Sequence, residues 1–312
     1  MKPNNFKEKL KIDTKFLLEA PLLKLIQRAN QVREQFIGKN FELCGIVNAK
    51  SGHCSEDCKF CAQSSHHKSE ISVYPLIAKE EIIDAARAAK TNGAKKFGIV
   101  TSGNRLDQKE LVTIAEAITE IKNIGIEPCA SLGALSKAEL TQLKDAGLTR
   151  YHHNIETSPR YYSQIASTHN FEERVNTVKA AKEVGLSVCS GGIVGMGETW
   201  QDRIDMATTL KELDVDSVPI NILVPIKGTA LESLPPLSGS DALRTICIFR
   251  IILQDKTIKI AAGRETTLKD FQAMGFMAGA NGMLIGGYLT VKGRTVAEDH
   301  KLIEEVTKLW NG

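Results

Sequence analysis

Residues 79–101 read KEEIIDAARAAKTNGAKKFGIVT and join a helical pattern directly to a strand pattern. Isoleucine and alanine recur at helical spacing up to a stop signal at Gly93. The short apolar run KFGIVT follows. Strand-like runs and helical patterns continue to alternate from here to the C-terminus, and this order predicts a parallel sheet whose strands are connected by crossover helices.

Eight strand-like runs occur along the chain. They are FELCGIV (41–47), KFGIVT (96–101), IEPCASL (126–132), RYHHNIE (150–156), LSVCSGG (186–192), SVPINIL (217–223), TIKIAAG (257–263) and GMLIGG (282–287). This number and order predict an α/β fold with a single (β/α)8 barrel of the TIM type, and an open doubly wound sheet is the alternative. Because a helical pattern over 15–36 comes first, we expect an N-terminal helical extension over 1–38 and a barrel domain over 39–312.

The composition excludes several partners. Hydrophobic residues make up 42% and charged residues 25% of the chain, as in ordinary globular proteins, and the net charge of +3 is too small to indicate binding to nucleic acid or a membrane. The polar N-terminus lacks the apolar run of a signal peptide. A cytoplasmic location is expected, where the seven cysteines would be metal ligands, catalytic thiols or core residues and not disulfides.

Three cysteines lie in the segment CSEDCKFC, which follows the first strand-like run. They are Cys54, Cys58 and Cys61. Active sites of such barrels gather at the C-terminal ends of the strands, so this loop would face a substrate. A 4Fe-4S cluster bound by only three thiolates keeps one iron open for another ligand. Zinc is the alternative, and its site would be completed by a nearby histidine: His53, His66 or His67.

A second set of cysteines lies within the strand-like runs. Cys44, Cys129 and Cys189 belong to the first, third and fifth runs, and Arg264 follows the seventh. Side chains from alternate strands fill a barrel in layers, so these four could meet in the lumen and hold a buried iron-sulfur cluster. Each cysteine alone could instead be a small core residue, which is our interpretation of Cys247.

The chain resembles the radical S-adenosylmethionine enzymes, and among them the biotin synthase family. The similarity rests on KSGHCSEDCKFCAQS, EPCASLGALS, YHHNIETSPRYY, VCSGGIVGMGETWQDR, SVPINILVPIKGTAL, and AAGRET followed by FMAGAN. It implies that the three loop cysteines hold a 4Fe-4S cluster whose fourth iron binds S-adenosylmethionine. Reductive cleavage would give a 5′-deoxyadenosyl radical that abstracts hydrogen from dethiobiotin, and an auxiliary cluster would supply sulfide. No catalytic residue beyond these cofactors is expected.

The resemblance also implies binding residues and partners. The S-adenosylmethionine positions are Phe60, Asn154, Glu156, Arg174, Gly191, Ile193, Gly195 and Glu198. The dethiobiotin positions are Lys50, His152, Asn154 and Asn221. Taken singly, these residues could be strand-end caps or solvated ion pairs worth at most about 1 kcal/mol. The implied partners are a flavodoxin or ferredoxin electron donor, iron-sulfur assembly proteins and a second copy in a homodimer.

The chain departs from the family pattern at the auxiliary cluster. The better-known biotin synthases hold a 2Fe-2S cluster with three cysteines and an arginine, and the first of those cysteines lies on the second strand, where this chain has Gly98. Cys44 stands where those enzymes usually have serine. We therefore predict that Cys44, Cys129 and Cys189 hold the auxiliary cluster, with Arg264 as a ligand or close hydrogen-bond donor. The changed set could also hold a larger, four-iron cluster with an extra sulfide.

Two other functions stay open on the sequence. One is a radical enzyme of the same barrel type that inserts no sulfur, as in the hydrogenase-maturase and methylornithine-forming branches, and the presence of Cys129, Cys189 and Arg264 argues against it. The other is a non-catalytic iron-sulfur protein. The nucleotide-type motifs at 154–156 and 191–198 argue against that function, because a scaffold needs no site for a ribose diol.

Overall fold

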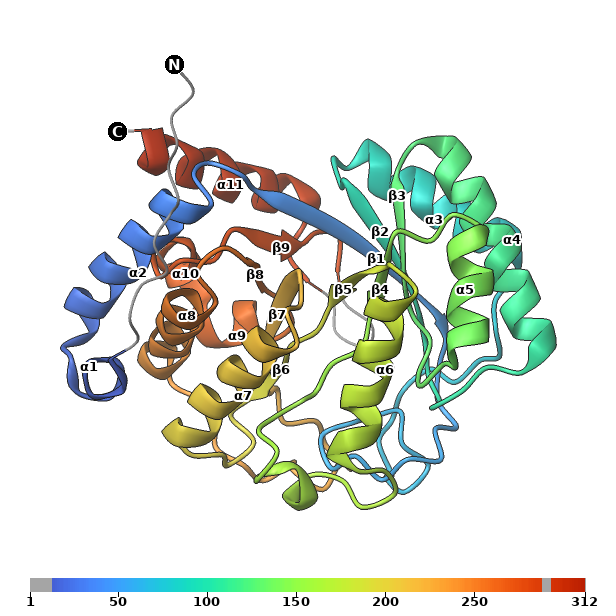
Figure 1. Cartoon of the computed structure of the whole chain (residues 1–312), viewed down its shortest axis with the longest axis horizontal. Helices are drawn as coiled ribbons and strands as arrows, with labels where there is room; N and C mark the ends of the chain where they lie inside the picture. The colour runs from blue at the N-terminus through green and yellow to red at the C-terminus, as the bar shows by residue number, and fades with distance from the viewer. Residues whose placement is uncertain (1–12, 288–292, 312) are drawn as a thin grey trace.

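The computed structural model describes residues 13–287 and 293–311. In these residues nine parallel strands form one sheet in the order β5-β4-β3-β2-β1-β9-β8-β7-β6, with a further pairing of β5 and β7. Because β5 (Ser187–Cys189) and β6 (Gly192–Val194) both pair with β7 (Ser217–Ile222), they share one strand position. The sheet is therefore closed with eight positions (Figure 1), and the predicted (β/α)8 barrel is confirmed.

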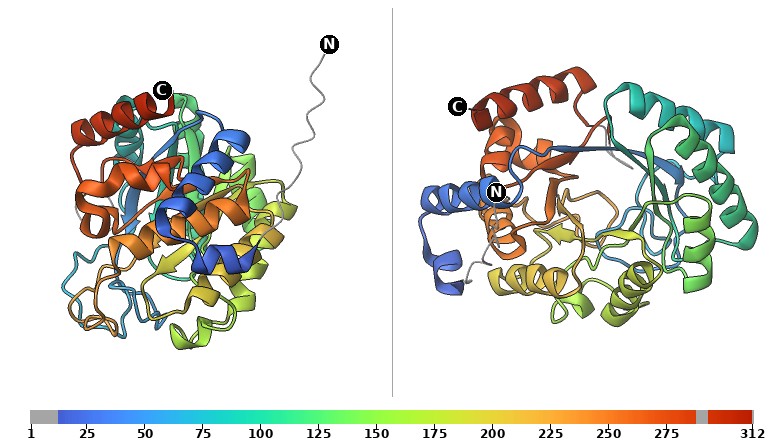
Figure 2. Two further views of the ribbon diagram at one scale, coloured as in Figure 1. Left: turned by 90° about the vertical axis from the view of Figure 1, so that its left-hand side faces the viewer. Right: turned by 45° about the horizontal axis from the view of Figure 1, so that its top comes forward.

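The other strands fall within the predicted runs, and helices surround them on all sides (Figures 1 and 2). These strands are β1 (Glu42–Lys50), β2 (Lys96–Thr101), β3 (Glu127–Ser131), β4 (Arg150–His152), β8 (Thr257–Ile260) and β9 (Gly282–Leu284). The barrel helices are α3 (Lys79–Thr91), α4 (Gln108–Ile124), α5 (Lys137–Asp145), α6 (Phe171–Glu183), α7 (Trp200–Glu212), α8 (Gly239–Leu253), α9 (Arg264–Leu268), α10 (Gln272–Met277) and α11 (Val296–Asn311). Two 3-10 turns, η1 (Tyr162–Gln164) and η2 (Lys269–Phe271), lie in the connections.

Local signals explain where the helices begin and end. At α5, the Ser136 hydroxyl accepts the backbone N–H of Glu139, and the Glu139 carboxylate accepts the backbone N–H of Ser136. Gly147 follows this helix with a φ of +111°, a conformation that suits glycine. These residues are the start and stop that the sequence predicts for this helix.

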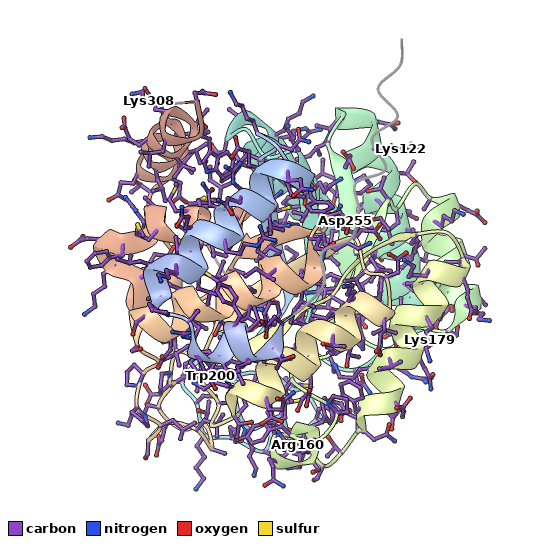
Figure 3. The ribbon with its side chains drawn as sticks, turned by 60° about the vertical axis from the view of Figure 1, so that its left-hand side comes forward. Lys122, Arg160, Lys179, Trp200, Asp255 and Lys308 are labelled. Atoms are coloured by element: carbon purple, nitrogen blue, oxygen red, sulfur yellow. The ribbon has the colours of Figure 1, made fainter. Side chains whose placement is uncertain are left out.

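The single N-terminal helix predicted over 15–36 is wrong. The structure has two helices there, α1 (Thr14–Glu19) and α2 (Leu22–Phe36). Pro21 separates them because proline has no N–H to donate and disfavours helical backbone at the residue before it; Ala20 has a ψ of 141°. Helix α2 packs against α8, and Figure 3 shows α1 and α2 lying across that side of the barrel.

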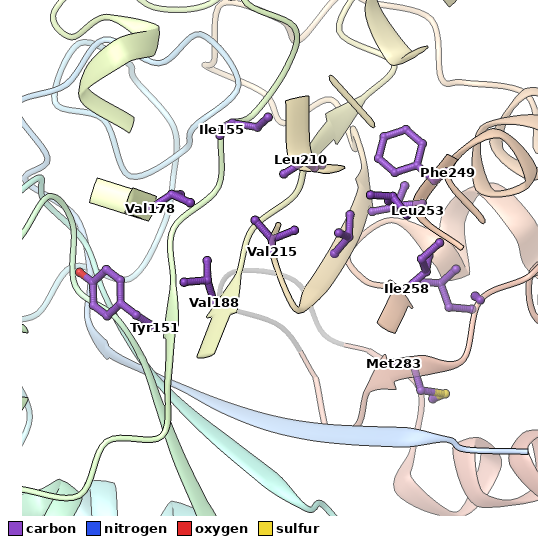
Figure 4. Close-up of a cluster of buried hydrophobic side chains, with 14 of the residues drawn as sticks. Tyr151, Ile155, Val178, Val188, Leu210, Val215, Phe249, Leu253, Ile258 and Met283 are labelled. Carbon is purple, nitrogen blue, oxygen red and sulfur yellow. The ribbon is translucent and has the colours of Figure 1, made fainter. Parts of the chain in front are cut away.

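Alternate residues of each strand point outward into an apolar layer beneath the helices. Val188 of β5, Ile258 of β8 and Met283 of β9 are fully buried in this layer, which also includes Phe249 and Leu253 of α8 (Figure 4). Successive side chains of a strand point to opposite faces, so the residues between these positions face the lumen. The outward layer forms the core, and the lumen side is left to carry chemistry.

The outer surface of the barrel is charged. Lys122, Lys179 and Lys308 lie on the solvent side of α4, α6 and α11 (Figure 3). Across residues 13–287 and 293–311, none of the helices is both long and apolar enough to span a bilayer.

Candidate active site

The lumen is lined by polar and sulfur-bearing side chains. These residues alternate along their strands with the outward-facing core residues, and they are Glu42, Cys44, Lys96, Cys129, Arg150, His152, Cys189 and Lys259. Ordinary barrel interiors are filled mainly by branched aliphatic side chains. Burying this many polar groups costs stability, which a purely structural interior would avoid. The lumen is therefore the candidate site.

The three strand cysteines all face this lumen. Cys44, Cys129 and Cys189 are 7%, 9% and 4% exposed, and the Lys259 ammonium donates to the Cys44 Sγ at 3.1 Å. Burial raises the pKa of Cys44 and raises that of Cys129 to about 12. Burial also opposes ionisation of Cys189, but Lys259, His152 and Arg150 together lower its pKa to about 6. The set is therefore a group of thiols held beside fixed positive charge, which fits an anionic iron-sulfur group.

A buried carboxylate joins the two lumen cations. Glu42 Oε1 lies 2.7 Å from both the Lys259 Nζ and an Arg150 guanidinium nitrogen. Burial opposes ionisation of Glu42, but the attraction of Lys259 and Arg150 outweighs it and lowers its pKa to about 2. The ion pairs with Glu42 therefore hold Lys259 and Arg150 in place beside the lumen thiols.

The sequence analysis missed Lys259 as a member of this site. A signal was present, since TIKIAAG places this lysine between Ile258 and Ile260, and both isoleucines belong to the apolar core. The two-residue period of a strand then directs the lysine into the lumen. A cation that faces the inside of a barrel marks a site for a negatively charged group.

The structure places Arg264 beside an acidic residue of the last helix. This residue comes after β8 and opens α9, and its guanidinium pairs with both carboxylate oxygens of Asp299 on α11, at 2.8 and 3.0 Å. Gln272 and Glu265 accept further bonds from it. The cation that the structure places beside the Cys44 thiol is Lys259 of β8, and the ligand role of Arg264 stays a prediction.

Cys44 and Gly98 occupy neighbouring layers of the lumen. Cys44 is in register with Lys96 of β2, and Ile46 is in register with Gly98. A Cβ built at Gly98 would lie 3.2 Å from the Ile46 Cγ2, which is tighter than ordinary packing. The space for a side chain at Gly98 is thus reduced, while Cys44 brings a thiol into the lumen from the adjacent strand.

The loop that carries the other three cysteines runs from β1 to α3. Asp57 in this loop accepts bonds from the backbone N–H groups of Ser167 and Thr168, at 2.8 and 3.1 Å, and from both of their hydroxyls. These bonds lower the pKa of Asp57, although partial burial opposes them. In Figure 1 the loop lies beside the segment that follows β4, where both residues are found. Asp57 therefore fastens the cysteine loop to the next part of the site.

We expect Asp57→Ala to loosen this loop. Losing a carboxylate that accepts several hydrogen bonds should increase proteolytic cleavage within residues 51–78 of the metal-free protein on the order of tenfold, because local opening becomes more populated. Limited proteolysis followed by mass spectrometry measures this rate. Asp84→Ala is the matched control, since Asp84 is an exposed helical acid paired only with the exposed Arg87 in the contacts described here. Equal rates for both variants would contradict the prediction.

Two of the loop thiols, Cys58 and Cys61, resist ionisation on their own. Burial, followed by repulsion from Cys61, raises the pKa of Cys58, and burial raises that of Cys61 to about 11. Such thiols become thiolates when a metal binds them. Three cysteines with thiolate chemistry fit an iron-sulfur cluster with one open iron.

Two of the three histidines considered for a zinc site have other partners. His66 Nε2 lies 3.0 Å from the Ser55 carbonyl oxygen, and His67 Nε2 lies 3.1 Å from the Cys58 carbonyl oxygen. His53 is exposed. Within the described ranges, no three His, Cys, Asp or Glu side chains are grouped closely enough to hold a single metal ion.

One cavity of about 390 Å³ joins the cysteine loop to the lumen thiols. Its wall includes Phe60 and Cys61 at the loop end and Cys189 and Lys259 at the lumen end. Between these ends it is lined by five residues that the sequence analysis assigned to ligands: His152, Asn154, Glu156, Ile193 and Asn221. The structure therefore brings eight of the predicted site residues into the wall of one cavity.

A polar chain crosses the middle of this cavity. His152 Nε2 lies 2.9 Å from Asn154 Oδ1, the Asn154 amide donates to Glu156 Oε2 at 3.3 Å, and Arg174 pairs with Glu156 Oε1 at 3.3 Å. Glu156 has a φ of +67°, an unusual backbone conformation for a residue with a side chain. Gly192 permits it, because a Cβ there would lie 2.2 Å from the Glu156 carbonyl oxygen. The strained backbone points to a functional role for Glu156.

The apolar part of the wall lies next to the cysteine loop. Phe60 and Ile193 pack against a small cluster that includes Tyr162, Met196 and Leu223. An apolar wall beside polar acceptors suits a ligand with a flat ring at one end and hydroxyl groups near it.

Other predicted residues lie around the cavity and not in its wall. Lys50 pairs with Glu110 at 2.6 Å, in a separate surface pocket near His53. Glu198 accepts the backbone N–H groups of Gly195 and Met196, at 2.8 and 2.7 Å. These two bonds shape the glycine-rich turn, so Glu198 and Gly195 support the wall from behind.

Comparisons with known proteins agree with this geometry. Residues 50–210 match the Radical SAM superfamily, and residues 219–307 match the Biotin and Thiamin Synthesis associated domain. A methylornithine synthase superposes with a TM-score of 0.81 at 22% identity, covering 94% of this chain and 91% of that one. An FeFe-hydrogenase maturase from Carboxydothermus hydrogenoformans superposes with a TM-score of 0.78 at 20% identity, covering 91% and 70%. At these identities the structural likeness shows the fold alone.

Sequence relatives are much more similar. Biotin synthase from Thermotoga neapolitana is 55% identical over 86% of this chain and 96% of its own length. The biotin synthases of Thermotoga petrophila and Clostridium acetobutylicum are 52% and 46% identical, over 95% and 89% of this chain and 98% and 86% of theirs. The chain belongs to the radical SAM superfamily and, within it, to the biotin synthase family.

Proposed function

We propose that this enzyme converts dethiobiotin to biotin by radical-mediated insertion of sulfur. The observation that carries the proposal is the single cavity that has a loop thiol at one end and a lumen thiol beside Lys259 at the other. Insertion of sulfur at an unactivated carbon by a radical route needs both a radical source and a sulfur source within reach of the substrate. The cavity offers thiol sets for both.

Cys54, Cys58 and Cys61 would hold the 4Fe-4S cluster that binds S-adenosylmethionine. With the cofactor bound, this centre supplies the radical that removes hydrogen from the substrate. Asn154 and Glu156 offer amide and carboxylate groups to the ribose hydroxyls, and Phe60 and Ile193 offer the apolar wall to the adenine. Arg174 lies behind Glu156 and is the proposed partner of the methionine carboxylate.

The substrate would occupy the middle of the cavity. Asn221 lines this region and carries both a donor and an acceptor, which match a ureido ring, although each now bonds a neighbouring strand, at Gly192 O and Ala262 N. His152 lies between Asn154 and Cys189 and could orient the same ring. Holding the substrate between the two thiol sets and excluding water is the protein's part of the reaction.

Cys44, Cys129 and Cys189 would hold the auxiliary cluster that donates sulfide. We propose Lys259 as its positively charged neighbour, because its Nζ lies 3.1 Å from Cys44 Sγ. The altered ligand set leaves both a 2Fe-2S cluster and a four-iron cluster with an extra sulfide as candidates. The flavodoxin or ferredoxin donor, the assembly proteins, the homodimer and the cytoplasmic location stay predictions.

The test is an anaerobic assay of the reconstituted protein with S-adenosylmethionine, dethiobiotin and a one-electron reductant. Formation of both 5′-deoxyadenosine and biotin is expected. Deoxyadenosine without biotin would favour a radical enzyme that inserts no sulfur. Absence of S-adenosylmethionine cleavage would favour a non-catalytic iron-sulfur protein.

A further inference from the structure

A buried histidine contacts one of the three loop thiols. His169 Nε2 lies 3.4 Å from Cys58 Sγ, and only 4% of the His169 side chain is exposed. The residue comes from the segment after β4, far from the cysteine loop in sequence. Among the described contacts, the other neighbour of His169 Nε2 is a carboxylate oxygen of Glu56, at the longer distance of 3.9 Å. The thiol is thus the nearer partner of the ring.

The other ring nitrogen has a partner that determines where the proton lies. The Tyr162 hydroxyl is 3.0 Å from His169 Nδ1, and Tyr162 is 2% exposed. Burial raises the pKa of Tyr162, and the positive charge of the nearby Arg174 opposes this rise. The protonated Tyr162 can donate its O–H to His169 Nδ1. This arrangement leaves the imidazole proton on Nε2, which faces the thiol.

Packing keeps these groups in place. The Tyr162 ring meets the Phe171 ring edge-on, with centroids 5.6 Å apart, and lies 5.8 Å from the His169 ring. A thiolate that binds iron offers only lone pairs to a neighbour, so an N–H directed at it forms a charge-assisted hydrogen bond. Hydrogen bonds to cluster sulfurs withdraw negative charge and make reduction easier.

We infer that His169 donates a hydrogen bond to Cys58 and raises the reduction potential of the cluster at the loop thiols, with Tyr162 holding the imidazole in the required tautomer. This inference rests on the proposed function, because it needs a cluster at Cys58. His169 is a positioning and tuning residue in this role and does not touch the substrate.

The experiment is a redox titration of the full, reconstituted protein. The reduced cluster is monitored through the electron paramagnetic resonance signal that changes when S-adenosylmethionine is added. His169→Ala should lower the ratio of reduced to oxidised cluster about tenfold at a fixed potential, which is a shift of about 59 mV for one electron. Tyr162→Phe should shift the potential in the same direction but less. His169→Gln should restore most of the wild-type potential, because its amide can donate from nearly the same place as Nε2.

Two matched variants control for general disturbance of the site. His66→Ala removes a histidine that contacts only a loop carbonyl in the described bonds, and Tyr161→Phe removes a hydroxyl that donates to the Met196 carbonyl. Both should keep the wild-type potential. An unchanged potential in His169→Ala and Tyr162→Phe, or a shift in His169→Gln as large as in His169→Ala, would overturn the inference. A wild-type protein without any signal that responds to S-adenosylmethionine would overturn the proposed function itself.

Discussion

Cys44→Ala should reduce biotin formation at least about 100-fold while S-adenosylmethionine cleavage stays within about threefold of wild type. The reason is the separation of the two thiol sets. Cys44 is a lumen residue held by Lys259, whereas the three loop cysteines follow β1 and are fastened to the segment after β4. The measurement is anaerobic quantitation of 5′-deoxyadenosine and biotin in the same reaction, together with iron and sulfide counts.

Cys247→Ala is the matched control for this variant. Cys247 is also fully buried, but it lies on α8 within the apolar core. Its removal should cost on the order of 1 kcal/mol of stability through a small cavity and leave iron, sulfide and biotin formation unchanged. If Cys44→Ala keeps its full complement of iron and sulfide and still makes biotin, the relocation of the auxiliary site to the first strand is refuted.

The barrel could be predicted because each strand carries its own signal. Runs such as KFGIVT are short and apolar, and helices such as the one after Ser136 have both a cap and a stop. These signals depend only on neighbouring residues, so they can be recognised from the sequence alone. The break at Pro21 is equally local, and the prediction of one helix over 15–36 gave too much weight to the apolar periodicity and too little to the proline.

The three thiols in the lumen could be predicted for a similar reason. A cysteine on a strand of a parallel barrel has two possible directions, and the adjacent core residue, Ala130 for Cys129 and Val188 for Cys189, settles which one it takes. The same rule was not applied to Lys259, although Ile258 and Ile260 flank it in the same way. Strand alternation would have favoured Lys259 over Arg264.

The remaining features depend on contacts between distant segments. Arg264 meets Asp299 thirty-five positions later, and His169 meets Cys58 across 111 positions. No periodicity or motif encodes such a pair, because neither partner is required by its own helix or loop. Motif resemblance gave Lys50 and Glu198 a ligand role that stays a prediction. In the folded chain Lys50 pairs with Glu110, and Glu198 pairs with the buried Arg203 and accepts backbone N–H groups of the glycine-rich turn.

Lys259→Met should also lower biotin formation by about 100-fold and reduce the iron and sulfide held at the auxiliary site. The substitution keeps the length of the side chain but removes the charge beside Cys44 and Cys189, and an anionic cluster then loses its nearest cation. Lys259→Arg keeps the charge and should retain at least about a tenth of the activity. Product formation and metal content of the reconstituted proteins measure both effects.

Arg264→Met separates a role at the cluster from a role in stability. Removing one partner of the buried Arg264–Asp299 pair should cost about 3–5 kcal/mol and lower the melting temperature, yet leave the auxiliary iron in place at low temperature.

The metal-free proteins give a second readout, because Lys259 is the charge that most lowers the pKa of Cys189, which is about 6. Its thiolate should be present above that pH in wild type and Arg264→Met, and appear only at higher pH in Lys259→Met. If Arg264→Met loses the auxiliary iron and Lys259→Met keeps all of it, the arginine and not the lysine serves the cluster.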